Sequence, residues 1–184
     1  MFKQATPFVR HLRRYFHAYG GWAAVFASPF FIAALAVASI SYSSWIHKDW
    51  TETSKSLIPN LLGFSLGTYS IIFSLVTTRI KRAMKASVGP SGSSRLEEVN
   101  ATFFHFILVQ VAALLWAFVY QGTLITDILT LASHSYPVAI PVLHSLRFIG
   151  SFVGYLLLIY SFLLILGAAL AVYRLALIVD PKDD

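Results

Sequence analysis

Residues 148–173 read FIGSFVGYLLLIYSFLLILGAALAVY, a run without a charged side chain. A helix needs about 20 apolar residues to cross the roughly 30 Å hydrocarbon core of a bilayer, so this run predicts a transmembrane helix. Three further charge-free windows, at 22–46, 56–78 and 99–126, are also long enough. The sequence therefore predicts an all-α integral membrane bundle with four spans, at about 22–46, 56–78, 101–121 and 148–173.

The composition agrees with a membrane protein. The chain of 184 residues is 57% hydrophobic and 12% charged, about half the charge of an ordinary soluble domain, and its mean hydropathy is +0.70. It contains no cysteine, which excludes disulfides, thiolate nucleophiles and cysteine metal sites. In so apolar a chain, the net charge of +6 indicates membrane orientation rather than nucleic-acid binding.

The distribution of lysine and arginine predicts the orientation of the spans. Four basic residues precede the first span, five lie between the second and third, and two follow the fourth, whereas the two other loops hold only three. This bias places both termini and the middle loop in the cytoplasm of a bacterial inner membrane. We expect a cytoplasmic segment at 1–21, the transmembrane domain at 22–178 and an acidic tail at 179–184. The first apolar run is too long for a signal-peptide core and lacks a small-residue cleavage site, so we expect it to be retained.

The segment Pro7–Tyr19 has the pattern of an amphipathic helix. Apolar residues recur at helical spacing, and the basic residues Arg10, Arg13 and Arg14 lie on the other side. Such a helix lies in the membrane interface, where each basic residue near an anionic leaflet contributes about 1 kcal/mol. It is either an orientation signal and anchor or a specific contact for a lipid or a partner.

The loops have less regular patterns. We expect residues 79–88 to continue the second helix into the cytoplasm with a basic face, and Gly89–Ser94 to end it with a flexible turn. The basic face consists of Arg79, Lys81, Arg82 and Lys85. The outer loop at 122–146 is too apolar for a plain solvated connection, so we expect an interfacial helix followed by a turn over Pro137–Pro141.

The second helix has the clearest motif. Small and polar residues recur at alternating steps of three and four, which puts them on a single helix face; they are Asn60, Gly63, Gly67, Ser70, Ser74 and Thr77. Small residues at such spacing let helix backbones approach closely in lipid. The stripe therefore packs against another helix of the bundle or another subunit, or else it lines a water-filled pathway.

The third and fourth helices also carry small or polar residues. Gly150 and Gly154 repeat the small-residue pattern on the fourth helix. His105 and Gln110 are the most polar intramembrane side chains of the third helix, and they point about 140° apart at 3.6 residues per turn. We expect His105 to be a hydrogen-bonded packing residue rather than a metal ligand or proton relay, because no second histidine or carboxylate shares a span with it. We expect Gln110 to bond to a neighbouring helix.

No motif for enzymatic chemistry is present. The chain lacks G-x-S-x-G, H-E-x-x-H, Walker and dinucleotide-binding patterns, and its carboxylates all lie in loops or tails. His134 and His144, in the outer loop, could share a metal only if that loop folds back. We therefore expect no enzymatic activity, cofactor or bound metal.

Two short segments resemble known sequences. Pro59–Gly67 (PNLLGFSLG) and His105–Gln110 (HFILVQ) resemble those of small uncharacterised bacterial inner-membrane proteins with four spans. The layout is also similar to that of the membrane subunit of Kiwa-type phage-defence systems. This second likeness lies in size and number of spans, so it implies no functional residue.

These features lead to two hypotheses about function. The first is a homo-oligomeric, non-enzymatic membrane anchor or sensor, in contact with membrane lipids and acting through a cytoplasmic protein partner, as in antiviral defence. The alternative is a small oligomeric ion channel lined by the second helix, with Asn60, Ser70, Ser74 and Thr77 along the path.

Overall fold

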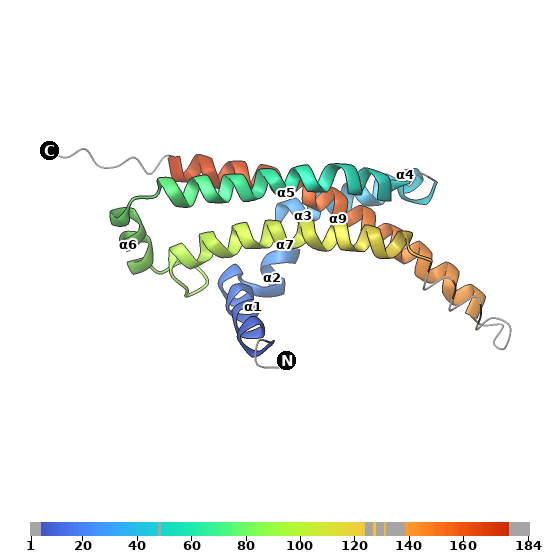
Figure 1. Ribbon diagram of the computed structural model, residues 1–184, viewed down its shortest axis with the longest axis horizontal. Helices are drawn as coiled ribbons and strands as arrows, with labels where there is room; N and C mark the ends of the chain where they lie inside the picture. Colours follow the sequence, from blue (N-terminus) through green and yellow to red (C-terminus); the bar gives the residue numbers. More distant parts are fainter. Residues whose placement is uncertain (1–4, 48, 124–126, 128–130, 132–138, 177–184) are drawn as a thin grey trace.

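The computed structural model describes residues 5–47, 49–123, 127, 131 and 139–176. Within that part the chain is helical and forms no strand. Three long helices run side by side: α5 (Trp50–Leu75), α7 (Arg95–Gln121) and α9 (Ala139–Ala176). The shorter helices are α1 (Ala5–Tyr19), α2 (Gly21–Phe26), α3 (Pro29–Ile40), α4 (Tyr42–Ile46) and α6 (Thr78–Ala86). We call the two ends of the bundle the α6 end and the α4 end (Figure 1).

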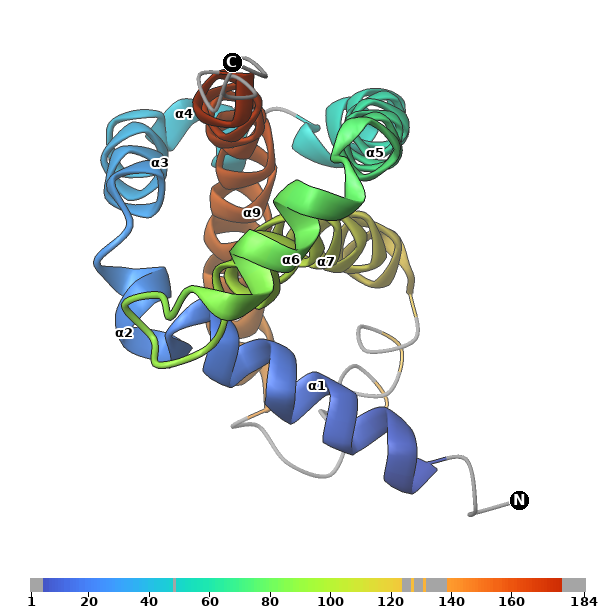
Figure 2. The same cartoon turned by 90° about the vertical axis from the view of Figure 1, so that its left-hand side faces the viewer.

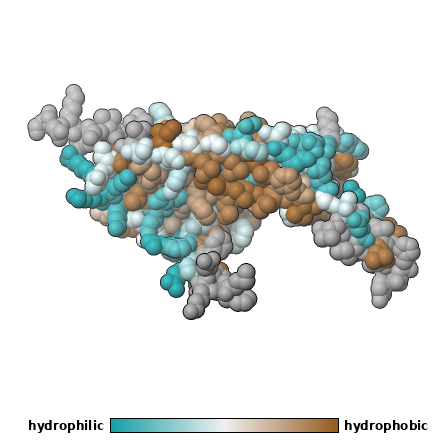
Figure 3. All heavy atoms as spheres, in the orientation of Figure 1, coloured by the Kyte–Doolittle hydropathy of each residue, from teal (hydrophilic) through white to brown (hydrophobic). Residues whose placement is uncertain are grey.

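The three long helices fit a membrane protein. Among the described residues, Trp50–Ser74, Arg95–Gln121 and Ile140–Tyr173 are long and apolar enough to cross a bilayer. Hydrophobic residues cover the middle of the visible face, and hydrophilic residues lie toward its two ends (Figure 3). A buried core near the α6 end joins α7 to α9 through Phe103, Phe106, Tyr160 and Leu164. The expected all-α membrane-type fold is confirmed.

The expected continuous helix over 22–46 is wrong. The chain forms α2, α3 and α4 in its place, and α3 packs along α9 (Figure 2). Ser28 is extended, with φ −64° and ψ 128°, because the ring of Pro29 disfavours the α conformation in the residue before it. The longest piece, α3, has 12 residues, fewer than the roughly 20 that a span needs.

The second helix ends earlier than expected. Val76 and Thr77 are extended, and α6 starts a new direction across the end of the bundle (Figure 2). The Thr77 hydroxyl accepts from Ile80 N at 3.4 Å, so the side chain caps α6 instead of allowing α5 to continue. The expectation that residues 79–88 continue the second helix is therefore wrong.

The turn between α6 and α7 is tied to α7. Ser91 donates from its backbone N and its hydroxyl to Glu98 Oε1, at 2.8 and 2.7 Å. A Cβ at Gly89 would lie 2.0 Å from the Glu98 carboxylate, so any larger residue would displace that side chain from its present position. The turn expected at Gly89–Ser94 is present, but these bonds fix its shape.

The helix α9 extends beyond the other helices at the α4 end (Figure 1). It begins at Ala139, so Pro141 lies in its first turn, where a missing N–H costs no helical hydrogen bond. The turn expected over Pro137–Pro141 is therefore wrong at Pro141. Pro137, His134 and most of the expected interfacial helix, like the acidic tail at 179–184, lie outside the described residues.

Two glycines of α9 accept aromatic side chains at the α4 end. A Cβ at Gly154 would lie 2.0 Å from Trp50 Cη2, and one at Gly150 would lie 3.2 Å from Tyr120 Cε2. The Trp50 indole donates to Ser151 Oγ at 2.8 Å, and Ser151 donates to the Trp45 carbonyl. These contacts join both sides of the α4–α5 connection to α9.

We expect Gly154→Ala to lower stability by about 1–3 kcal/mol, since the added methyl overpacks the Trp50 site. The thermal unfolding midpoint in detergent measures this effect. Ala169→Val, which adds bulk at an exposed position of the same helix, is the control. An unchanged midpoint for Gly154→Ala would show that Trp50 does not depend on this contact.

Candidate functional site

The small and polar stripe of α5 faces outward. Asn60, Gly63, Gly67, Ser70 and Ser74 are all exposed, and we call them the small-residue face. Among the described residues, no atom outside the local helix lies within 4 Å of a Cβ built at Gly63 or Gly67. Thr77 lies beyond the helix, at the start of α6. The stripe does not pack against α7 or α9 of the same chain.

The bundle uses the other side of α5. Ile58, Leu61, Ser65 and Ile72 are buried, and at 3.6 residues per turn they fall opposite the small-residue face. The helix thus presents apolar residues and the buried Ser54 and Ser65 inward, and glycine, serine and asparagine outward. In a helix whose small residues pack within its own bundle, those residues would face inward instead.

Polar groups on the small-residue face bond to their own helix. Asn60 Nδ2 donates to the Ser56 carbonyl at 3.1 Å. The hydroxyls of Ser70 and Ser74 donate to the Leu66 and Ile71 carbonyls at 2.9 and 2.8 Å. These bonds occupy the hydroxyl donors, so the face can lie in an apolar environment without unpaired hydroxyl protons.

The polar cluster around His105, which we call the α1 junction, joins three helices. Tyr15 of α1 lies 2.8 Å from Nδ1 of the imidazole, and Tyr160 of α9 lies 2.9 Å from Nε2, measured at the phenol oxygens. The Tyr19 ring stacks on His105 with 4.0 Å between centroids. A neutral imidazole has one donor and one acceptor nitrogen, so both nitrogens are satisfied by these two phenols.

Burial favours the protonated form of Tyr15, one of the two tyrosines that α1 contributes to this cluster. Desolvation, with a smaller contribution from Tyr19, raises the pKa of Tyr15 to about 12, so its hydroxyl remains a hydrogen-bonding group at any physiological pH. Groups of three or more potential metal-ligating side chains are absent from the described residues. The cluster can therefore fasten α1 to the bundle.

Sequence reasoning missed the two phenols. Tyr15 lies outside the predicted spans, and Tyr160 lies in a different span from His105, so no spacing along the chain connects them. The spacing of Tyr15 and Tyr19 by four residues was the available signal, because it puts two phenols on one side of α1.

Gln110 makes a bond between helices inside the bundle. It is fully buried, and its Nε2 donates to Ser65 Oγ of α5 at 3.0 Å. Its Oε1 and the hydroxyl of Ser161 have no hydrogen-bond partner within the described part of the chain. His105 and Gln110 therefore serve different helix contacts, the first toward α1 and α9 and the second toward α5.

Among the basic residues of α1 and α6, Arg14 has an acidic partner. Arg14 forms an ion pair with Glu97, so it fastens α1 to α7. Arg10 and Arg13 of α1 and Arg82 and Lys85 of α6 are exposed, whereas Lys81 is half-buried. The exposed charges lie on two helices that pack at or near the α6 end of α7 (Figure 2).

Comparison with known proteins assigns no role to these surfaces, so a role can be argued only from their geometry. No family model, curated protein or solved structure matches the chain. The resemblance to small four-span proteins and the similarity of layout to the Kiwa membrane subunit therefore remain predictions.

Removing one phenol hydroxyl is expected to loosen α1. The chain has no cysteine, so Ala18→Cys, at a buried position of α1, gives one site for maleimide. We expect Tyr15→Phe to raise the labelling rate about tenfold, because a buried imidazole nitrogen loses its partner at a cost of about 1–3 kcal/mol. Tyr42→Phe, at an exposed tyrosine, is the control. Equal rates in the two variants would contradict a fastening role for His105.

Proposed function

We propose that this chain is a non-enzymatic subunit of a bacterial inner membrane that self-assembles through the small-residue face of α5 and presents the basic surfaces of α1 and α6 to a cytoplasmic protein. The observation that carries the proposal is the outward direction of the small-residue face. Gly63 and Gly67 lie on it, and the described residues of the single chain leave open space beside them.

Self-assembly follows from how helices associate in lipid. Lipid tails are as apolar as leucine, so association depends on close backbone approach and van der Waals packing. The glycines permit that approach, and the hydroxyls of Ser70 and Ser74 are already bonded to their own helix. A second copy of α5 would gain packing without leaving hydroxyl donors unpaired.

The proposed topology places the α6 end in the cytoplasm, with both termini there. The excess of basic residues in the N-terminal segment and the middle loop supports this orientation. In this arrangement α2, α3 and α4 together form the first of four crossings, and α1 lies at the inner interface.

The exposed arginines and lysines support a partner at that end. Arg10, Arg13, Arg82 and Lys85 project from helices that have no acidic residue of their own. The α1 junction and the ion pair between Arg14 and Glu97 hold α1 in place, so its charges have a defined position. The similarity of layout to the Kiwa membrane subunit suggests antiviral defence as the setting.

A disulfide test addresses self-assembly. Because the natural chain has no cysteine, Ser70→Cys in native membranes gives one reactive thiol on the small-residue face. We expect oxidation to produce a covalent dimer, and Gly67→Leu in the same chain to suppress it. Leu115→Cys, exposed on α7, is the control for random collision, and Ala112→Leu, also exposed on α7, is the control for added bulk.

Equal cross-linking of Ser70→Cys and Leu115→Cys would contradict assembly through α5.

The alternative function, an ion channel, would use the same face, since Ser70 and Ser74 would then line the path. A channel would give a current in planar bilayers. Ser74→Leu should reduce the conductance, and Lys81→Glu should shift the reversal potential toward the value for cations. Cross-linking without any current supports the subunit function over the channel.

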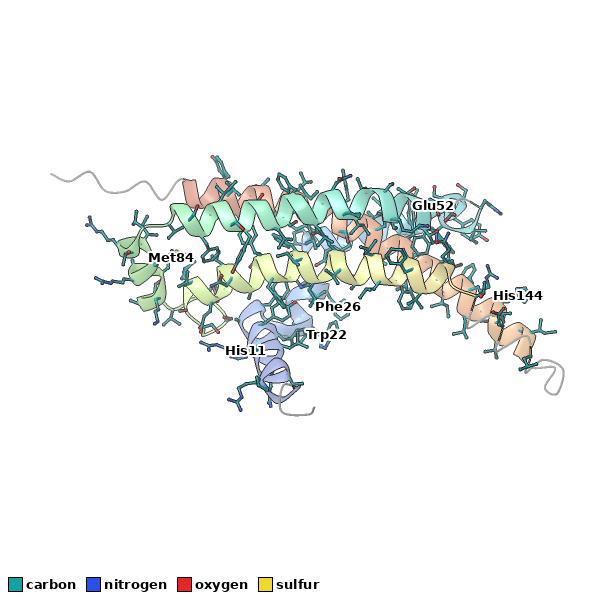
Figure 4. The ribbon with its side chains drawn as sticks, viewed as in Figure 1. His11, Trp22, Phe26, Glu52, Met84 and His144 are labelled. Carbon is teal, nitrogen blue, oxygen red and sulfur yellow. The ribbon has the colours of Figure 1, made fainter. Side chains whose placement is uncertain are left out.

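A photo-cross-linking test addresses the partner. We expect a photoreactive residue at Arg10 or Arg82 to give adducts with a second protein in cells, and Arg82→Glu with Lys85→Glu to remove them. A photoreactive residue at His144, exposed at the α4 end (Figure 4), is the control. Adducts that contain only copies of this chain would contradict a cytoplasmic partner.

A further inference from the structure

A large cavity lies at the α6 end, where the chain changes direction twice. Its volume is about 1130 Å³, and residues of α2, α3, α6, α7 and α9 line it. The break before Pro29 separates α2 from α3, and the turn at Val76–Thr77 carries α6 across the end of the bundle. The cavity is therefore a product of these two breaks. Met84 of α6, which lines it, is labelled at this end in Figure 4.

The cavity is apolar inside and basic at its mouth. Phe103, Phe106 and Leu164, all buried, form part of its wall. The lining also includes Arg79 of α6 and Arg95 at the start of α7, and both arginines are exposed. An occupant that matches both regions has apolar chains and an anionic head.

The two carboxylates close in sequence to Arg95 bind other residues and do not line the mouth. Glu97 pairs with Arg14 of α1, and Glu98 accepts two hydrogen bonds from Ser91. Neither carboxylate belongs to the cavity lining. Within the part of the chain that the structure describes, the positive charge of Arg95 is thus available to an anion at the mouth.

We propose that this cavity binds one anionic phospholipid, with its phosphate at Arg79 and Arg95 and its acyl chains against Phe103, Phe106 and Leu164. Basic pockets between transmembrane helices on the cytoplasmic side are a recurring site for anionic headgroups. The cavity lies where α5 ends and α7 begins, which is the depth of the headgroups for helices that cross a bilayer. This site goes beyond the proposed function; it rests on the proposed orientation of the α6 end but not on self-assembly.

The two regions of the cavity distinguish this occupant from others. A free phosphate would leave the phenylalanine wall uncovered, and a neutral lipid would offer no anion to the basic mouth. Only an anionic amphiphile uses both, and phospholipids are the abundant anionic amphiphiles of a membrane. The expected ligand is therefore the lipid itself rather than its headgroup.

Native mass spectrometry of delipidated protein in detergent micelles tests the site. With phosphatidylglycerol in the micelles we expect one retained lipid per chain, and much less retention with phosphatidylcholine. Arg95→Gln is expected to weaken phosphatidylglycerol binding about fivefold, and Arg79→Gln with Arg95→Gln about 25-fold, since each basic residue contributes about a factor of five. Arg82→Gln with Lys85→Gln removes the same charge from α6 residues outside the lining and should change binding less than twofold.

A second pair of variants tests the apolar part and does not depend on charge. Ala83 and Ala86 are both exposed on α6, but only Ala83 lines the cavity. Ala83→Phe should reduce lipid retention at least fivefold, whereas Ala86→Phe should leave it unchanged.

Three results would overturn the proposal. Equal retention of phosphatidylglycerol and phosphatidylcholine would show that the arginines do not select an anionic headgroup. Displacement of the lipid by millimolar inorganic phosphate would show a headgroup site without a chain site. Absence of any retained lipid in protein whose unfolding midpoint matches that in native membranes would indicate that a protein segment occupies the cavity.

Discussion

Close packing of large aromatic side chains against small residues of α9 holds the described helices together. Gly150 faces Tyr120 and Trp116 of α7, Gly154 faces Trp50 of α5, and Gly167 faces Phe106 of α7 and Phe30 of α3. Every other long helix, and the broken segment α3–α4, therefore meets α9. Dispersion forces decrease steeply with distance, so a single added methyl at these positions separates the surfaces and weakens the packing that helix association in lipid depends on.

The same sequence pattern has opposite roles in α9 and α5. Both helices carry glycines four residues apart, and both patterns predicted a close helix contact. In α9 the chain itself fills the space, whereas the described residues leave the space at Gly63 and Gly67 open. Local spacing determines that residues share a face, but which neighbour covers that face depends on the arrangement of all the helices. This is why the sequence left the alternatives open.

The three long helices were predictable because a charge-free run is a local property with a single physical cause, the thickness of a bilayer. The segment before them was less predictable. Pro29 lies within an apolar run and adds no charge to it, yet it divides the run through the conformation of Ser28. The phenol partners of His105 were also missed, because no spacing along the chain connects residues 15, 105 and 160.

The length of α9 makes the thickness of the surrounding bilayer part of the energetics of the bundle. Its 38 residues extend about 57 Å at 1.5 Å per residue, well beyond a hydrocarbon core of roughly 30 Å. Ile140, Val142 and Leu146, at the extended end, are exposed apolar residues. A thicker membrane covers more of this segment and a thinner one less, at a fraction of a kcal/mol per Å of mismatch. Tilting of α9 in response would change the angle at which every helix packed against it meets the membrane.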